Sequence, residues 1–191
     1  MRISGGSAKG RRISPGKALP KGAEECGLRP TSAKVREAVF DILRSRMAGA
    51  SFLDLYAGTG AVGIEALSQG AGKAVFVDDN PRMIALIGEL IDKFGFRGKA
   101  TLIRDKAAAF IKRSASVFDI VFADPPYESG ELETVLPLID KSAILGENSI
   151  VMAEHASRHA LPASIGGLEL ARRYKYGDTS LSVYRRRKER P

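Results

Sequence analysis

Five short runs of apolar, β-branched and aromatic residues recur between residues 51 and 154, and segments with helical periodicity separate them. The runs read SFLDLYA (51–57), KAVFVD (73–78), KATLIRD (99–105), VFDIVFAD (117–124) and NSIVMAE (148–154). Runs as apolar as these are typical of strands that are covered on both faces. Strands that alternate with helices form right-handed crossovers, so the pattern predicts an α/β fold with a mostly parallel sheet and helices on both faces.

The two ends of the chain differ from this pattern. In residues 168–187, apolar and polar residues alternate around Gly177-Asp178, which predicts an antiparallel hairpin at the edge of the sheet and brings the expected number of strands to seven. Residues 1–28 are rich in Gly, Pro and basic residues and predict an arm that holds one short hairpin rather than core structure. We therefore expect a basic arm, 1–28, followed by one domain, 29–191.

Two helices can be placed by their caps and apolar stripes. The first begins after Thr31 or Ser32, and Gly95 is placed to end the second. The expected stripe of the first is Val35, Val39, Ile42 and Leu43, and that of the second is Ile84, Ile87, Ile91 and Phe94.

The net charge of +8 is concentrated at the two ends of the chain. Residues 1–46 hold eleven Lys/Arg and four Asp/Glu, residues 172–191 hold eight and two, and the middle is mildly acidic. Basic segments that flank an acidic core are expected in a protein that binds a polyanion, although solvated tails would have the same composition.

The cysteine and histidine content excludes several kinds of site. The single cysteine, Cys26, cannot form an internal disulfide, and two histidines leave no convincing metal cluster. No stretch has the apolar character of a signal peptide or a membrane span, so we expect a soluble cytoplasmic protein.

A glycine-rich loop follows the first predicted strand. Gly58, Gly60 and Gly63 have G-x-G-x-x-G spacing and lead into a predicted helix, and the second strand ends at Asp78, twenty positions after Gly58. Such a loop lets a ligand approach the backbone, and an acid at that distance can accept hydrogen bonds from ribose hydroxyls. Asp54, an acid inside an apolar strand, needs a hydrogen-bond partner or a ligand amine. The combination predicts an adenosine-type cofactor, although a tight turn in an unrelated α/β protein would also fit the glycines.

The fourth predicted strand stops at Asp124-Pro125-Pro126-Tyr127. Each proline fixes its own φ and lacks a backbone donor, so the strand must end and the turn must be stiff. Ligands of open α/β sheets lie beyond the carboxyl ends of the strands, so this turn and the glycine loop should face one crevice.

The two motifs together resemble class I S-adenosylmethionine-dependent methyltransferases, in which DLYAGTG looks like the cofactor loop and DPPY like the [DNS]-P-P-[YF] motif of nitrogen-methylating enzymes. RISGGSAKGRR, RPTSAKVREAVFDIL, FLDLYAGTGAVGIEALSQGA, FDIVFADPPY and YGDTSLSVY look more specifically like the RsmD family, which methylates guanine N2 in 16S ribosomal RNA. The family implies one Rossmann-like domain and the guanine 966 type of modification during small-subunit assembly. The acid that ends the second strand, often Glu in the family, is Asp78 here, which shortens its reach.

The resemblance also implies roles for individual residues. The catalytic residues are Asp124, Pro125, Pro126 and Tyr127: the carboxylate and the Pro125 carbonyl accept hydrogen bonds from the target amine, and the ring of Tyr127 stacks on the base. The cofactor-binding residues are Asp54, Tyr56, Gly58, Thr59, Gly60, Gly63, Asp78, Asp105, Lys106 and Ala107. Asp105 is implied as the partner of the adenine amino group, although it could equally cap the next helix. The expected RNA contacts are Arg2, Lys9, Arg11, Arg12, Arg29, Thr31, Lys34 and Arg36.

Other functions fit parts of the same sequence. A DNA adenine or a protein glutamine methyltransferase could use the same turn, and an RNA-binding module could keep the fold without activity. The intact acids and glycines speak against the last of these. Glu154 could border the base pocket or be purely structural, and the histidines are expected to be bystanders. We expect a monomer that uses no metal.

Overall fold

A single mixed sheet organises the protein. The computed structural model describes residues 2–13, 32–127 and 129–187. The sheet has the strand order β3-β2-β1-β4-β5-β8-β7-β6. Its strands are β1 (Ser51–Leu55), β2 (Lys73–Asp78), β3 (Ala100–Arg104), β4 (Phe118–Ala123), β5 (Leu145–Ala156), β6 (Ser164–Ile165), β7 (Leu168–Tyr176) and β8 (Thr179–Arg186). The first five strands run parallel and the last three pair antiparallel.

The predicted α/β fold and its C-terminal hairpin are confirmed, but the expected number of strands was wrong. An eighth strand, β6, consists of two residues that pair with Leu168 and Glu169. A strand of two residues is too short to show an apolar alternation, so backbone pairing with β7 reveals it where the sequence could not.

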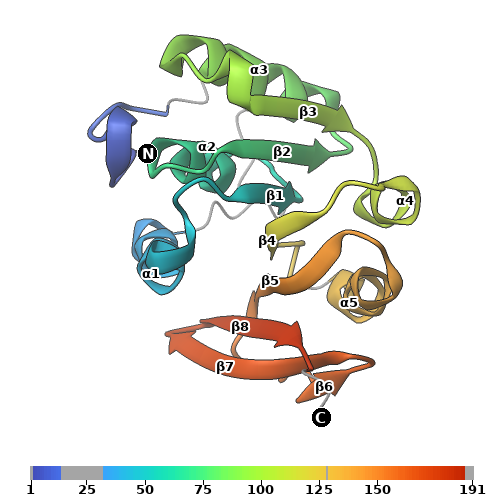
Figure 1. Cartoon of the computed structure of the whole chain (residues 1–191). Helices are drawn as coiled ribbons and strands as arrows, with labels where there is room; N and C mark the ends of the chain where they lie inside the picture. The colour runs from blue at the N-terminus through green and yellow to red at the C-terminus, as the bar shows by residue number, and fades with distance from the viewer. Residues whose placement is uncertain (1, 14–31, 128, 188–191) are drawn as a thin grey trace.

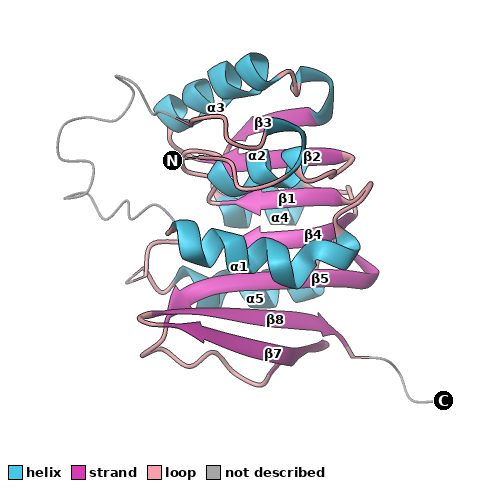
Figure 2. Ribbon diagram, turned by 90° about the vertical axis from the view of Figure 1, so that its left-hand side faces the viewer, coloured by secondary structure: helices cyan, strands magenta, loops and turns pink. Residues whose placement is uncertain are grey.

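Helices cover both faces of the sheet (Figures 1 and 2). Their bounds are α1 (Ala33–Leu43), α2 (Ala61–Ser68), α3 (Pro81–Phe94), α4 (Ala107–Arg113) and α5 (Glu131–Lys141), with 3-10 turns at Gly6–Ala8, Arg44–Arg46 and Arg97–Lys99. The first three helices pack against one apolar cluster and the last two against the other. Alternate residues of a strand divide between the clusters: Phe52 of β1 joins the first and Leu53 joins the second. None of the helices within the described ranges is long and apolar enough to cross a membrane.

The expected helix ends are largely confirmed. The hydroxyl of Ser32 accepts a hydrogen bond from the Val35 amide at 3.2 Å at the start of α1. Gly95 ends α3 with φ 76°, a left-handed conformation that glycine adopts without a steric cost. The side chain of Asn80 caps the start of α3 by accepting a hydrogen bond from the Arg82 amide at 2.9 Å. Within the predicted stripes, Ile42 and Ile84 are only half-buried, because the buried face of each helix is centred slightly to one side of these residues.

The described part of the N-terminal arm, residues 2–13, folds back on itself and packs on the domain. Arg2 and Arg12 form an antiparallel bridge, which fits the expected hairpin. Its composition predicts an arm outside the core, whereas Ile3, Ala8 and Ile13 are at most 2% exposed and belong to the first apolar cluster. The predicted boundary after residue 28 lies outside the described residues and stays a prediction.

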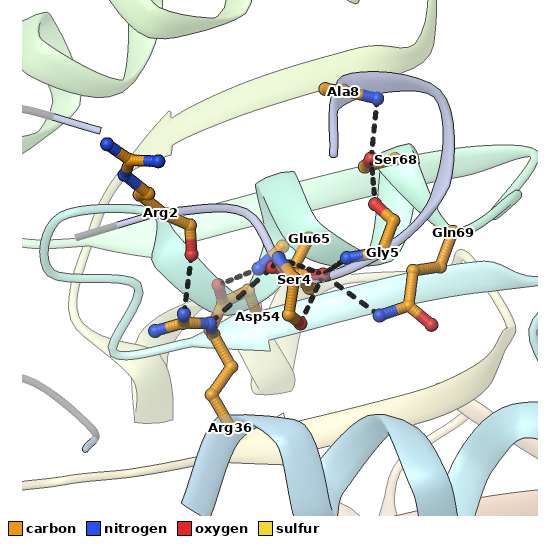
Figure 3. A network of polar contacts seen from close by, with 10 residues as sticks. Arg2, Ser4, Gly5, Ala8, Arg36, Asp54, Glu65, Ser68 and Gln69 are labelled. Atoms are coloured by element: carbon orange, nitrogen blue, oxygen red, sulfur yellow. Dashed lines mark hydrogen bonds and ion pairs between the residues drawn. The ribbon is translucent and has the colours of Figure 1, made fainter. Parts of the chain in front are cut away.

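A buried carboxylate in α2 holds this segment (Figure 3). Glu65 is fully buried and accepts hydrogen bonds from the Ser4 amide, the Ser4 hydroxyl and the Gly5 amide at 2.8 to 3.0 Å. Arg36 of α1 lies 3.5 Å from the same carboxylate, and its guanidinium also donates to the Arg2 carbonyl at 2.8 Å. The arm is therefore tied at one point to both α1 and α2.

Candidate active site

The carboxyl ends of β1, β2 and β4 lie side by side at one edge of the sheet. Leu55 of β1 is in register with Val77 of β2 on one side and with Ala123 of β4 on the other. The chain segments that follow these strands must therefore meet, and they carry the glycine loop, Asp78 and the Asp124 turn. The crevice expected from the sequence is formed by neighbouring strands.

The glycines of the loop serve different purposes. Gly58 and Gly60 have φ of 52° and 73°, which disfavours other residues, and among the described residues a Cβ on Gly58 would meet only the Tyr56 carbonyl oxygen at 3.9 Å. A Cβ on Gly63 would lie 2.3 Å from the Phe76 ring, so this position is needed for close packing of α2 on the sheet. The loop thus leaves its backbone open on the side of Gly58 and packs tightly at Gly63.

Asp54 is a buried acid directly beneath the loop. Its carboxylate is 2% exposed and accepts a hydrogen bond from the Gly63 amide at 2.8 Å, in the first turn of α2. Burial raises the pKa of this carboxyl well above its ordinary value, and the negative charges of Asp124 and Asp78 raise it further, against the opposing effect of the Gly63 hydrogen bond. Three carboxyl groups from three strands therefore share one electrostatic environment, which favours a cationic ligand.

Asp78 braces the glycine loop. One oxygen of its carboxylate accepts from the Gly58 amide at 2.7 Å and the other from the Asn80 amide at 2.9 Å. Burial raises the pKa of Asp78 even though these hydrogen bonds oppose the shift. Each carboxylate oxygen can accept a second hydrogen bond, so the ribose contact expected from the sequence remains compatible with this geometry.

Asp105 lies next to Asp78, at the end of β3. Its amide donates to the Asp78 carbonyl at 3.1 Å, and its carboxylate pairs with Arg113 of α4 at 2.9 Å. The carboxylate also accepts from the Lys106 amide, but the N-cap residue of α4 is Lys106, so the alternative role of Asp105 as that cap is wrong. Lys106 is exposed and Ala107 is buried at the start of α4.

Tyr56 links the first strand to the loop in an unusual conformation. Among the described non-glycine residues it alone has a positive φ, 66°, which costs a side chain of this size on the order of 1–3 kcal/mol. Burial raises the pKa of its phenol, and the neighbouring Glu131 carboxylate adds to the effect. Strain of this kind is concentrated at functional sites, and here it lies three residues before the half-buried Thr59.

The fourth strand stops at the Asp124 turn, where its prolines predict a stop. β4 ends at Ala123, Pro125 is buried, and the turn closes where the Ser129 amide and hydroxyl both donate to the Pro126 carbonyl, at 3.0 and 2.7 Å. In the chain, the Pro125 carbonyl comes one residue before the Pro126 carbonyl that closes the turn. A cavity of about 170 Å³ lies on the α5 side of the turn, and Pro125, Pro126, Tyr127, Glu154 and His159 contribute to its lining.

Tyr127 is held by residues of two further strands. Its hydroxyl donates to a carboxylate oxygen of Glu154 in β5 at 3.2 Å and lies 2.8 Å from the hydroxyl oxygen of Thr179 in β8. The sequence left Glu154 open as either a border of the pocket or a structural acid, and it did not reveal Thr179, because no local pattern links residues 127 and 179. His155, whose Nε2 lies 2.8 Å from the Ser182 hydroxyl, is also buried and contributes to the lining of the same cavity.

The structure changes the set of expected RNA contacts. Arg36 is 1% exposed and paired with Glu65, so its assignment as an RNA contact is wrong. The acid that attracts it lies far away in the sequence, in α2, and could not be matched to it before the fold was known. The exposed Arg11 donates to the Lys93 carbonyl and lies over the Phe94 ring at 4.6 Å, which makes it a contact between the arm and α3. Arg2, Lys9, Arg12 and Lys34 are exposed. Arg29 and Thr31 lie outside the described residues.

No group of three or more His, Cys, Asp or Glu side chains in the described ranges is arranged to hold a metal ion.

The sequence missed Glu65, Ser4 and Ser68, whose contacts bind the arm. An acid in a helix whose other residues are buried is the one signal that could have indicated Glu65.

Comparison with known proteins identifies the family. The family model described as "Conserved hypothetical protein 95" matches residues 1–185. "Putative rRNA methyltransferase YlbH" of Bacillus subtilis is 33% identical over 98% of this chain and 100% of its own length. "Ribosomal RNA small subunit methyltransferase D" of Escherichia coli is 30% identical over 97% of this chain and 90% of its own. The solved structure of "Putative methyltransferase yhhF from Escherichia coli" superimposes with a TM-score of 0.85 at 26% identity and covers 99% of both chains. The chain therefore belongs to the Conserved hypothetical protein 95 family, the RsmD-type methyltransferases of small-subunit ribosomal RNA.

Proposed function

We propose that this protein transfers a methyl group from S-adenosylmethionine to the exocyclic N2 of a guanine in 16S ribosomal RNA, within the small subunit or its assembly precursor. One observation carries the proposal. The Asp124-Pro125-Pro126-Tyr127 turn, which resembles the motif of nitrogen methylation, lies on the strand directly beside the one that carries the glycine loop. A donor held by the loop and an amine held by the turn would then be neighbours.

The residues at the sheet edge fit this cofactor. Asp54 and Asp78 place carboxyl groups beside the glycine loop, which suits a positively charged cofactor, and the loop is open at Gly58. The bound cofactor would supply an electrophilic methyl group on a positively charged sulfur. We assign the adenosine end to the Asp78 and Asp105 side, because these residues end β2 and β3, on the far side of β1 from the turn.

Asp124 and the Pro125 carbonyl would activate the target nitrogen. The lone pair of guanine N2 is delocalised into the ring, so the amine is a weak nucleophile until its two N–H groups are held out of that conjugation. A carboxylate and a fixed carbonyl can each accept one N–H and so direct the lone pair toward the methyl group. Their contribution is alignment and electrostatics rather than strong base catalysis.

Exposed basic side chains of the arm and of α1 would bind the phosphates. Arg2, Lys9, Arg12 and Lys34 are free to approach RNA in the described part of the chain. Deleting the whole arm is a poor test of this role, because it would also remove Ile3, Ala8 and Ile13 from the core. Lys9→Gln with Arg12→Gln should instead weaken binding to the subunit and lower the slope of log K against log salt by about 0.7 for each phosphate that is no longer neutralised. Lys112→Gln, on the exposed side of α4, is the matched control.

The reaction is tested with labelled S-adenosylmethionine and small ribosomal subunits from a strain that lacks the corresponding methyltransferase. Nucleoside analysis should give N2-methylguanosine. Labelled N6-methyladenine in DNA, or labelled glutamine in protein, would assign the turn to a different acceptor and refute the proposal.

Asp124→Ala tests the role of the turn. We expect turnover to fall by about 10²–10³-fold, the effect typical of removing a key hydrogen bond to the transition state. Cofactor affinity, measured by calorimetry, should stay near that of the wild type. Asp92→Ala on the surface of α3 is the control. A large loss of cofactor affinity in Asp124→Ala would contradict the assignment of this carboxylate to the target amine.

A further inference from the structure

The hydroxyl of Tyr127 joins the catalytic turn to the C-terminal part of the sheet. In the antiparallel pairing of β5 with β8, Glu154 is opposite Leu181 and Thr179 is opposite Ala156. Glu154 and Thr179 are therefore diagonal neighbours on one face of the sheet, and the Tyr127 hydroxyl bonds to both of them. Three segments that are distant in the sequence meet at a single oxygen atom.

The chemistry of these groups suits a fixed arrangement. A phenol has one proton to donate and can also accept, so it can give its proton to the Glu154 carboxylate and accept the proton of the Thr179 hydroxyl. Glu154 is 3% exposed, and water competes poorly for a group buried to that degree. Burial raises the pKa of the Tyr127 phenol, as do the charges of Glu154 and Asp124, so the phenol keeps its proton at neutral pH.

A stacking surface by itself would not need this hydroxyl. The motif that the turn resembles accepts either Tyr or Phe, and a phenylalanine ring offers the same flat face. With both hydrogen bonds in place, the ring of Tyr127 is anchored at its far end as well as at its backbone. Such anchoring matters where alignment limits the rate, because a misplacement of about 1 Å can cost about 10²-fold.

We propose that Glu154 and Thr179 are positioning residues, which hold the ring of Tyr127 at the angle that a target base needs to present its amine to Asp124. The inference rests on the proposed function and adds β5 and β8 to the working parts of the site. The C-terminal hairpin thereby has a second role besides closing the edge of the sheet: its first β8 residue, Thr179, touches the catalytic turn.

Four variants separate positioning from simple stability in the rate measurement, and Glu154→Gln joins them in the spectroscopic one. Tyr127→Phe removes the anchored hydroxyl, and Thr179→Val removes one of its partners without changing the size of that side chain. Thr179→Ser restores a hydroxyl at the same position. Tyr184→Phe is the matched control, because it removes another hydroxyl of β8, which donates to the Pro162 carbonyl at 2.7 Å on the opposite face of the sheet.

The first measurement is the rate of methyl transfer to small subunits. We expect Tyr127→Phe and Thr179→Val to lower kcat by about 10- to 100-fold while the Kd for S-adenosylmethionine changes less than about twofold. Thr179→Ser should recover most of the rate, and Tyr184→Phe should keep kcat even if its melting temperature falls. Wild-type kcat and KM in Tyr127→Phe would overturn the proposal, and so would a loss of rate in Tyr184→Phe equal to that in Thr179→Val.

The second measurement does not depend on activity. Fluorine NMR of protein labelled with 3-fluorotyrosine gives five signals to assign, and Tyr127→Phe identifies the one from residue 127. This signal should move in Thr179→Val and in Glu154→Gln but not in Tyr184→Phe. An unmoved signal overturns the inference even if the rates fall. If the variants move this signal as expected but the wild-type protein methylates no guanine, the proposed function is refuted and the anchoring of the ring stays supported.

Discussion

Replacing Glu65 with alanine is the most direct test of how the arm is held. This carboxylate is fully buried and takes hydrogen bonds from the Ser4 amide and hydroxyl, the Gly5 amide and the Gln69 side chain, besides its ion pair with Arg36. Glu65→Ala leaves these donors without their acceptor and leaves a buried guanidinium without its counter-charge. Removing one partner of a buried ion pair costs about 3–5 kcal/mol, a large part of the 5–15 kcal/mol that stabilises a typical domain.

The loss should be visible by two methods. For a chain of this size each kcal/mol lowers the melting temperature by about 2–4 °C, so Glu65→Ala should melt about 6–20 °C below the wild type. Hydrogen exchange should show that the amides of Ser4 and Gly5 lose their protection. The matched control is Glu89→Ala, on the exposed side of α3, for which a change within about 0.5 kcal/mol is expected. If urea titrations place Glu65→Ala within about 1 kcal/mol of that control, the reasoning about the buried network is refuted.

Other contacts yield further predictions. A Cβ on Gly6 would lie 1.7 Å from the Ser68 carbonyl oxygen, whereas a Cβ on Gly10 would have no atom of the described part of the chain within 4 Å, and both residues have a left-handed φ, of 73° and 79°. Gly10→Ala should therefore cost only the backbone strain of about 1–2 kcal/mol, and Gly6→Ala should also release the arm to limited proteolysis; equal sensitivity of the two would contradict the packing. Asp119 accepts hydrogen bonds from the Ser51 amide and hydroxyl, which hold the pKa of its carboxyl below the ordinary value. Because its native pKa lies below the unfolded value of about 3.9, this stabilisation is present above that pH and is lost as the pH falls through the native pKa. Asp119→Asn should then destabilise the protein at neutral pH, and the difference from the wild type should shrink as the pH falls through the native pKa; a loss of equal size at every pH would argue against the ionised carboxylate as the cause.

The elements that could be predicted are those whose signals are local. The strand from Lys73 to Asp78 and the stop after Ala123 are read from apolar runs that end in acids or prolines, and both have those bounds in the structure. Ser32 and Gly95 were predicted as helix ends because capping depends on side chains within a few residues. The two-residue strand β6 was missed because its pairing with Leu168 is decided by the neighbouring strand.

The candidate site divides in the same way. Gly63 and Asp78 were named from spacing and Asp54 from its place inside an apolar strand, and the structure brings the three together around the loop through the Gly63 and Gly58 amides. Arg36 was misjudged because a basic residue on a helix near a basic arm looks exposed in a sequence. Its partner, Glu65, is 29 positions away, and only packing of α1 against α2 shows that the pair is buried.

The sequence by itself determined the α/β class, the glycine loop and the stiff turn at Asp124, because each depends on residues within one strand and the turn that follows it. The tertiary structure alone decided which charges are buried and which segments support the turn. Burial and long-range hydrogen bonds depend on distances between residues far apart in the chain, such as Ser4 and Glu65 or Tyr127 and Thr179, which lie 61 and 52 positions apart. No local pattern carries that information, since the carboxylate of Glu65 or the hydroxyl of Thr179 would look the same on an exposed surface.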